Sequence, residues 1–487
     1  MCEPRRGRSD LALASGLVAL LLAGGACRSD PGPGETDVGC SYESCSPVCR
    51  ARDAWFRGCP DGACLCSDEL DGGVEDAHGD ATDDGADDAP LPPCDGYRVP
   101  LEERPGASPG VVCRRVSVSE LEESLLDFAG DGAYIAFRAT PDTTPLRMWL
   151  YDRPSRCITL LDGLTDLVPG HRGVGAIDPS VEGQRIAYVA GGTEVETGIR
   201  RSQIRLIRVG DPAPVIVREL AEIPLDPTHG KVPFLGSVVL RYPWIAFRKS
   251  GSENGWSWFA YAYNIETGEE RNLSEAPDGM PADPEGYWDS VLRVDLLGTT
   301  AVFDSGFGGY GRPLVQEIIQ VDVETGEAAI LSSDPAGQYW PTITPRWVAW
   351  LDQRVAPMCD WFSLCRTDVY GLERESGTEH ALVTAPPSMQ GPWMDGEGDW
   401  LLYEDQRDGT DVATSSDREE DMYAFHLPTR TEVRVTDWPG FEMYPKVYDR
   451  QDGTFGGLFI QEIDYGRALY RLWDCDLPAP TTGGSGP

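Results

Sequence analysis

This chain of 487 residues has few lysines and only five histidines. Its lysines are Lys231, Lys249 and Lys446, so the other basic residues are arginines. Acidic residues outnumber basic ones by 80 to 41, which gives a formal net charge of −39. Nucleic acids and anionic lipid headgroups attract clustered Lys and Arg, so this composition excludes both as binding partners. The simplest role of the acidity is solubility.

A hydrophobic run long enough for a permanent membrane helix is also missing. The apolar stretch 11–23 has 13 residues, whereas a spanning helix needs about 20. It follows the basic residues Arg5, Arg6 and Arg8, and small residues at 24–26 lead into Cys27. A basic start, a short apolar run and small residues are typical of an export signal. We therefore predict a signal peptide over 1–26.

The small residues before Cys27 resemble the bacterial lipobox, whose cysteine is lipidated and becomes the mature N-terminus. Gly24 departs from the usual Leu, and Gly-x-Ala also suits ordinary signal peptidase. Of 14 cysteines, Cys2 leaves with the signal and Cys27 would carry lipid, which leaves an even number for disulfides. Arg28 follows in place of the Asp of inner-membrane lipoproteins. The resemblance thus predicts an outer-membrane lipoprotein facing the periplasm or the cell surface.

Residues 27–39 read as a tether, and a cysteine-rich segment follows over 40–66. So short a segment cannot bury a core, and exported cysteines are oxidised, so a disulfide mini-domain is expected. Six cysteines allow fifteen pairings, which the sequence leaves open. A zinc site is disfavoured because paired C-x-x-C motifs and histidines are missing from the segment. The cysteines are Cys40, Cys45, Cys49, Cys59, Cys64 and Cys66.

Residues 67–110 are predicted to be a linker, acidic at first and then rich in Pro and Gly. The part from 67 to 93 has ten acidic and no basic residues, so charge repulsion favours an extended spacer. Weak calcium binding is the alternative, because carboxylates are calcium ligands. The fixed register of a calcium loop is missing. We therefore expect no cofactor, with Ca²⁺ as the alternative.

A short apolar strand recurs seven times between residues 134 and 460. The central residues of these strands lie 51, 59, 55, 48, 53 and 57 residues apart. Such a period with strand chemistry in every unit is typical of a β-propeller. We predict an all-β fold with seven blades over 111–476, with six or eight as alternatives, and a disordered tail over 477–487. The strands are 134–137, 186–189, 244–247, 301–303, 347–350, 400–403 and 457–460.

Hairpins follow these strands, as in 259–274 and 319–333, where Glu-Thr-Gly turns join alternating strands. Two units share Asp352-Gln353-Arg354 and Asp405-Gln406-Arg407 after the apolar strand. This repeat resembles the WD40-like repeats of TolB-type propellers. The resemblance rests on the Ile-Ala-Phe strand, the Asp-x-Arg motif, the Thr-Gly turn and a final Leu/Val-Thr. That resemblance implies a periplasmic protein that makes protein contacts, in agreement with the export signal.

The seventh repeat has no outer strand, whereas residues 111–118 form a strand without a blade. We predict that 111–118 completes blade seven, because closure removes an exposed sheet edge. Cys113 and Cys475 would then form a disulfide near the seam. Cys359 and Cys365 are expected to form a disulfide within a loop of blade five. Cys94 and Cys157 then remain and are expected to pair with each other.

No catalytic constellation is visible in the sequence. The five histidines do not have the sequence spacing of metal ligands: His78, His171, His229, His380 and His426. The acidic loop 405–421 contains Arg407 and Arg418, which favours an ion network over calcium. Five tryptophans at the predicted strand ends either pack in the core or form a rim that stacks on sugar rings: Trp256, Trp258, Trp288, Trp340 and Trp393.

We predict a monomeric, non-catalytic scaffold that binds an envelope protein or glycan through one propeller face. The alternative is a polysaccharide lyase or glycoside hydrolase with carboxylates in the central funnel. A pair of inward carboxyls would support the hydrolase.

Overall fold

The computed structural model divides into two units, Met1–Pro90 and Leu91–Pro487. In the first unit it describes an antiparallel hairpin of β1 (Trp55–Gly58) and β2 (Leu65–Ser67). Cys66 lies on β2, but the pairing of the cysteine cluster, the signal peptide and Cys27 lie outside the described residues. In the second unit the structure describes residues 91–122, 125, 127–140, 147–168, 176–194, 196, 200–221, 234–250, 258–277, 291–307, 315–332, 334, 336–354, 367–384, 393–405, 407, 420–464 and 469–478.

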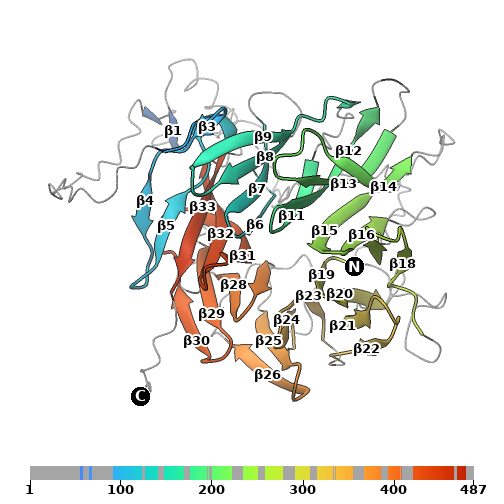
Figure 1. Cartoon of the computed structure of the whole chain (residues 1–487). Helices are drawn as coiled ribbons and strands as arrows, with labels where there is room; N and C mark the ends of the chain where they lie inside the picture. The colour runs from blue at the N-terminus through green and yellow to red at the C-terminus, as the bar shows by residue number, and fades with distance from the viewer. Residues whose placement is uncertain are drawn as a thin grey trace, which may run out of the picture. The chain divides into compact units, whose positions relative to one another are not determined.

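The second unit is a ring of seven antiparallel sheets, which confirms the predicted seven-bladed β-propeller and excludes six or eight blades (Figure 1). Blade 1 comprises β6 (Phe128–Asp131), β7 (Tyr134–Ala139), β8 (Arg147–Asp152) and β9 (Cys157–Asp162). Blade 2 comprises β11 (Ala176–Glu182), β12 (Arg185–Glu194), β13 (Arg200–Arg208) and β14 (Val215–Ala221), with β10 (Leu167–Val168) also on β12. Blade 3 comprises β15 (Leu235–Arg241), β16 (Trp244–Ser250), β17 (Trp258–Asn264) and β18 (Glu270–Asn272).

The remaining blades keep the same order from the innermost to the outermost strand. Blade 4 comprises β19 (Val294–Leu297), β20 (Thr300–Phe307), β21 (Val315–Asp322) and β22 (Ala328–Ile330). Blade 5 comprises β23 (Gln338–Ile343), β24 (Trp347–Asp352), β25 (Asp368–Glu373) and β26 (Thr378–Val383). Blade 6 comprises β27 (Met394–Glu397), β28 (Trp400–Asp405), β29 (Asp421–His426) and β30 (Thr431–Arg434). Blade 7 begins with β31 (Phe441–Asp449), β32 (Phe455–Asp464) and β33 (Leu469–Leu477).

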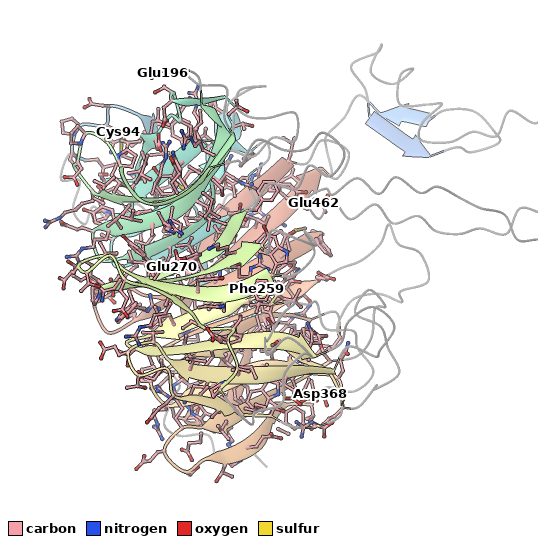
Figure 2. All side chains as sticks on the ribbon, turned by 90° about the vertical axis from the view of Figure 1, so that its right-hand side faces the viewer. Cys94, Glu196, Phe259, Glu270, Asp368 and Glu462 are labelled. Atoms are coloured by element: carbon pink, nitrogen blue, oxygen red, sulfur yellow. A yellow bond between two sulfur atoms is a disulfide. The ribbon has the colours of Figure 1, made fainter. Side chains whose placement is uncertain are left out.

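The hydrophobic core lies between neighbouring sheets, where side chains fill the space seen from the side in Figure 2. The apolar repeats become the second strands, and every residue of β24 and β28 is buried. One cluster joins Trp347 and Leu351 of blade 5 to Tyr403 and Phe425 of blade 6. Burial on both faces explains why these strands read as continuous apolar runs rather than as alternating ones.

The Thr-Gly turns form hairpins between the third and fourth strands, as predicted. In blade 4, the Asp322 carboxylate accepts hydrogen bonds from the backbone of Glu324 and Thr325, at 3.0 and 2.7 Å. Gly326 then has a φ of 76°, in the left-handed region that favours glycine. The carboxylate and the glycine together specify the turn.

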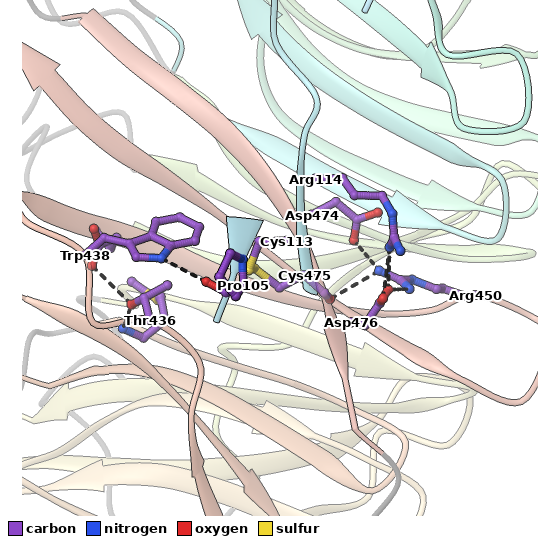
Figure 3. Close-up of a disulfide and its surroundings, with 11 residues drawn as sticks. Pro105, Cys113, Arg114, Thr436, Trp438, Arg450, Asp474, Cys475 and Asp476 are labelled. Atoms are coloured by element: carbon purple, nitrogen blue, oxygen red, sulfur yellow. Dashed lines mark hydrogen bonds and ion pairs between the residues drawn. A yellow bond between two sulfur atoms is a disulfide. The ribbon is translucent and has the colours of Figure 1, made fainter. Parts of the chain in front are cut away.

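Blade 7 is completed by β5 (Val112–Arg115), which pairs antiparallel with β33. Cys113 lies opposite Cys475, and the two form the expected disulfide (Figure 3). The predicted closure of the ring by the segment 111–118 is therefore confirmed. The residues that close the ring are 362 positions apart in sequence.

Polar and aromatic contacts reinforce the seam beside the disulfide. Asp476 accepts from Arg114 at 2.8 Å, and Asp474 accepts from Arg450 at 2.6 Å (Figure 3). Trp438 donates its indole N–H to the carbonyl of Pro105 at 3.2 Å. The closing strand is thus held on both sides of the bridge.

The predicted linker needs a correction, because two short strands lie inside it. β4 (Glu103–Pro105) pairs with β5, and β3 (Tyr97–Arg98) pairs with the outer edge of β9. These segments satisfy backbone groups on exposed sheet edges, a pairing that Pro/Gly-rich composition does not reveal. Cys94 forms a disulfide with Cys157 at the start of β9. Cys359 and Cys365 lie outside the described residues.

Helix is almost missing from the described part of the chain. It contains one 3-10 segment, η2 (Ser119–Leu121), on the connection from β5 to β6. No helix there has the length and apolar character needed to cross a membrane.

Candidate functional site

A cavity of about 250 Å³ lies in the central channel, between the innermost strands. Because every blade repeats the same strand order, these strands run in the same direction and finish at the same end of the channel. Charged side chains from blades 1, 2, 3, 4, 6 and 7 line the cavity. The carboxylates are Asp131, Glu182, Asp295, Asp395, Glu397 and Asp449, and the cations are Arg241, Arg293 and Lys446.

The two deeper carboxylates join neighbouring blades. Asp295 accepts hydrogen bonds from the Thr342 hydroxyl and the Ile343 backbone, both at 2.9 Å. Asp395 accepts from the Val447 backbone at 2.9 Å and pairs with Arg293. Burial alone raises the pKa of Asp395, but nearby Lys446, Arg293 and the backbone donor lower it overall. These two carboxylates therefore act as links between blades.

Four further carboxylates form an acidic ring at the end where the innermost strands finish: Asp131, Glu182, Glu397 and Asp449. Asp131 accepts a hydrogen bond from the Gly183 backbone, which joins blade 1 to blade 2. Glu182 likewise accepts from the Tyr242 backbone of blade 3 at 2.7 Å. Asp449 accepts from the Gln451 backbone within its own turn, at 2.6 Å.

Arg241 of blade 3 reaches Glu397 of blade 6 at 2.5 Å. Burial is the largest effect on this glutamate, and the charges of Asp295, Asp395 and Asp131 act in the same direction. Arg241 opposes them, but together they raise the pKa of Glu397 to about 7. Glu397 is therefore the channel carboxyl best placed to exchange a proton near neutral pH.

Sequence reasoning missed the acidic ring, although the repeat carries a signal for it. Asp131, Glu182 and Glu397 each stand three residues before the second strand of their blade. Each precedes a glycine with φ between 56° and 59°. An acidic-Gly pair at a fixed offset from the apolar strand could have located three of the four ring residues.

An aromatic cluster of Trp340, Trp393 and Tyr444 lies near the beginnings of three innermost strands. The Trp393 ring packs edge-on against Trp340 and Tyr444, with centroids 4.3 and 4.8 Å apart. All three side chains are half-buried. The Arg293 guanidinium lies 5.7 Å from the Trp340 ring centroid.

Bulges in the innermost strands present two of these rings. Trp340 and Tyr444 both have a φ of 60°, at register shifts in β23 and β31. Their backbone N–H groups donate to Asp304 at 3.0 Å and to Glu404 at 2.6 Å, on the preceding blades. A bulge redirects a side chain, which here places aromatic rings together at the channel.

Of the tryptophans singled out in the sequence, the structure brings Trp340 and Trp393 together. Trp258 is half-buried elsewhere, with the Arg248 guanidinium 4.9 Å from its ring centroid. Trp256 and Trp288 lie outside the described residues. Trp340 packs against the core between blades 5 and 6, but both rings are only half-buried, so the sugar-stacking alternative stays open.

The described histidines occupy the periphery of the ring. His380 on β26 packs edge-on against Trp347, and His426 at the end of β29 pairs with the Thr429 hydroxyl at 2.8 Å. His78, His171 and His229 lie outside the described residues. Within the described part of the chain, no group of three or more His, Cys, Asp or Glu is arranged to hold a metal ion.

The Asp-x-Arg motif forms the same ion network in blades 5 and 6. Arg354 binds Asp352 at 2.6 Å and Glu379 at 2.7 Å, and its guanidinium lies 3.8 Å from the Tyr370 ring centroid. Arg407 binds Asp405 and reaches Glu432 at 2.7 Å in the same way. Arg407 thus makes its part of the network predicted for the loop 405–421, and Arg418 lies outside the described residues. The motif ties the second, third and fourth strands together.

Arg354→Met is expected to destabilise the propeller by about 2 kcal/mol, because it leaves the fully buried Asp352 without its cation. Trp350 still donates to Asp352 at 3.1 Å, which limits the loss. Chemical denaturation measures the change. Arg346→Met is the matched control, since Arg346 is 55% exposed and 3.6 Å from Glu373. Equal losses in both variants would refute the role of the network.

Comparison with known proteins identifies the fold and no family. No protein-family model and no curated protein matches the chain. An oligogalacturonate lyase from Vibrio parahaemolyticus has a TM-score of 0.51 at 10% identity, over 78% of this chain and 98% of its own. The β-propeller domain of the Trilobed protease from Pyrococcus furiosus has a TM-score of 0.48 at 11% identity, over 72% and 95%. TolB from Acinetobacter baumannii has a TM-score of 0.35 at 15% identity, over 64% and 66%.

The similarity to the lyase structure, at 10% identity, establishes a shared β-propeller fold. A fold that supports many functions does not by itself select one.

Proposed function

We propose that this chain is an exported lipoprotein of the bacterial cell envelope whose propeller binds a glycan or a protein without catalysis. The aromatic cluster carries this proposal, because half-buried rings beside Arg293 offer stacking surfaces at one end of the channel. Aromatic side chains with few rotatable bonds supply contact area at low entropic cost. Such a surface suits the flat faces of sugar rings, and we favour the glycan.

Inward carboxyls are the feature that a hydrolase would need, but the bonds that hold the six channel carboxylates favour a non-catalytic role. Each of the six accepts a hydrogen bond or forms an ion pair within the chain, and four of them link different blades directly through hydrogen bonds to backbone groups. Groups held this way stabilise the ring. A catalytic pair would instead need one free carboxyl beside the bound substrate.

Attachment to the envelope is part of the same proposal and rests on the sequence around Cys27. Lipidation there would leave the tether and the acidic spacer between the membrane and the propeller. Radiolabelled fatty acid should be incorporated into the wild-type protein and not into Cys27→Ser.

Binding to polysaccharides tests the proposed function. Affinity electrophoresis of the full chain against neutral and acidic polysaccharides, polygalacturonate included, should reveal at least one ligand. Trp393→Ala should weaken binding at least about tenfold, since truncating an aromatic anchor costs 1.4 kcal/mol or more. Tyr242→Ala removes a 39%-exposed ring beside the acidic ring, at the other end of the channel, and should change nothing. Equal binding by both variants would reject the aromatic cluster as the site.

A polysaccharide-cleaving enzyme is the second candidate, because the pKa of Glu397 is raised to about 7 and a carboxyl of that pKa can act as a general acid. The same polysaccharides, assayed for new reducing ends and for absorbance of unsaturated products, decide between the two. Product formation that Glu397→Gln abolishes would replace the binding proposal by this one.

A further inference from the structure

A second cavity, of about 500 Å³, lies at the seam between blade 7 and blade 1. Its wall is formed by β5, β8, β33 and the β3–β4 connection, together with the β6–β7, β8–β9 and β31–β32 turns. This seam cavity shares no residue with the aromatic cluster or with the acidic ring. Its volume falls in the range of small-molecule sites.

Arginine lines the seam cavity in a chain that is otherwise strongly acidic. Of its five guanidiniums, four are neutralised by carboxylates. These ion pairs are Arg114–Asp476 at 2.8 Å, Arg115–Glu122 at 2.6 Å, Arg153–Asp474 at 3.2 Å and Arg450–Asp474 at 2.6 Å. The acidic wall residues are likewise engaged: Glu102 binds Arg115 at 3.0 Å, and Asp452 accepts from Thr454.

Arg156 is the fifth guanidinium, and no side chain in the described part of the structure pairs with it. It is half-buried in the β8–β9 turn. Its φ is 51°, at the position where blades 3, 4 and 5 place Gly268, Gly326 and Gly377 with φ of 74°, 76° and 65°. Blade 6 also has an arginine there, Arg430 with a φ of 54°, so blades 1 and 6 share an arginine at a left-handed position that glycine occupies without strain in three other blades.

Tyr151 provides a second unused donor in the same wall. Its side chain is 6% exposed, and its hydroxyl has no hydrogen-bond partner among the described residues. Burial, followed by the charge of Asp474, raises the pKa of Tyr151 to about 12, so the phenol stays protonated. Arg153 and Arg156 act on the same pKa in the opposite direction. Tyr151 and Arg156 both line the seam cavity.

The turn that carries Arg156 is held in place from outside. Arg98 donates to the Ser155 carbonyl at 2.6 Å, and the Val99 backbone donates to the Arg156 carbonyl at 2.9 Å. The neighbouring Cys157 is fixed by its disulfide to Cys94. The backbone that carries the guanidinium is therefore fixed before any ligand arrives.

We propose that the seam cavity binds a small oxyanion, the carboxylate or phosphate group of a ligand, through Arg156 and the Tyr151 hydroxyl. A guanidinium and a neutral phenol both donate, and oxyanions accept without donating. The other four arginines of the cavity already pair with carboxylates, so Arg156 is left to bind one anionic group. The apolar Pro100, Leu101 and Pro154 would contact the rest of the ligand.

Titration calorimetry of the full chain with inorganic phosphate, and separately with succinate, tests the proposal. Saturable binding of either probe is expected, and the probe that binds identifies the source of the oxyanion. Arg156→Gly should weaken binding at least about tenfold while keeping the fold, because glycine occupies the equivalent position in three other blades. Tyr151→Phe should weaken it more modestly.

Arg208→Gln is the matched control, since it removes an exposed guanidinium of blade 2 and should bind as the wild type does. Failure of both probes to bind, or equal binding by Arg156→Gly, would overturn the proposal. Arg156→Gly should leave polysaccharide binding at the aromatic cluster unchanged, so the two proposals fail independently.

Discussion

Replacing Cys113 and Cys475 together by alanine is expected to lower the free energy of unfolding by about 6 kcal/mol, the largest effect in the molecule. The bond closes a loop of 362 residues, so in the chain-entropy description it removes much freedom from the unfolded chain. It also fixes the strand β5, which covers the open edge of blade 7. Both cysteines are fully buried, and alanine avoids placing a hydroxyl there.

Urea denaturation of the oxidised full chain measures this loss, and thiol titration verifies the change in disulfide content. Removing Cys94 and Cys157 is the matched control, because that bond closes a loop of 63 residues. The loop-length relation makes its loss smaller by about 1.5 kcal/mol. A seam variant as stable as the wild type would show that pairing of β5 alone holds the ring closed.

Stability is expected to rise as the pH falls from 8 to 5, the reverse of ordinary acid denaturation. The pKa of Glu397 is raised from 4.5 to about 7 in the folded protein. The folded state therefore holds this proton more tightly than the unfolded state does. The tighter proton binding adds up to about 3 kcal/mol to the free energy of unfolding. This contribution is complete below about pH 4.5 and is lost as the pH rises through 7.

Three other buried carboxyls act in the same direction, whereas burial lowers the pKa of His426, which opposes them. Burial raises the pKa of Glu404, and the charge of Glu420 adds to the effect. Burial also raises the pKa of Glu442, with Asp421 as the next cause. The pKa of Asp304 is likewise raised by burial. Asp395 and Asp476 have lowered pKa values despite burial, because of their cations, so their contributions are lost only in stronger acid. The maximum of stability should therefore lie near pH 5.

Urea midpoints at pH 5, 6, 7 and 8 check this profile. Glu397→Gln keeps a partner for Arg241 and should reduce the slope between pH 5 and 8, with a gain in stability at pH 8. Glu324→Gln removes the same charge from an exposed turn and controls for net charge. A wild-type midpoint that increases steadily from pH 5 to 8 would contradict the raised pKa.

The fold was predictable because its signals are local and repeated. The seven apolar strands follow from runs such as Trp347–Trp350, which must be buried on both faces. The turn at Gly326 follows from a residue type that tolerates positive φ. Closure followed from counting strands, since a blade without an outer strand and a strand without a blade can satisfy each other.

The functional surfaces were much less predictable, because they assemble residues from distant blades. Arg241 and Glu397 are 156 positions apart, and no local pattern pairs them. Trp340 and Trp393 were visible as candidates, whereas Tyr444 joins them only through the bulge in β31. β3 and β4 were missed because edge pairing of two or three residues leaves no periodic signal.

The sequence by itself determined the repeat, favoured seven blades over six or eight, and predicted the closing strand and its disulfide, because strand periodicity and the number of cysteines are properties of the chain alone. The tertiary structure decided which charges meet. Channel carboxylates became links between blades, and the pKa of Glu397 was raised to about 7. Arg156 was left without a side-chain partner among the described residues, in the same cavity wall as Tyr151. Those outcomes depend on distances across a ring, which a linear pattern does not contain.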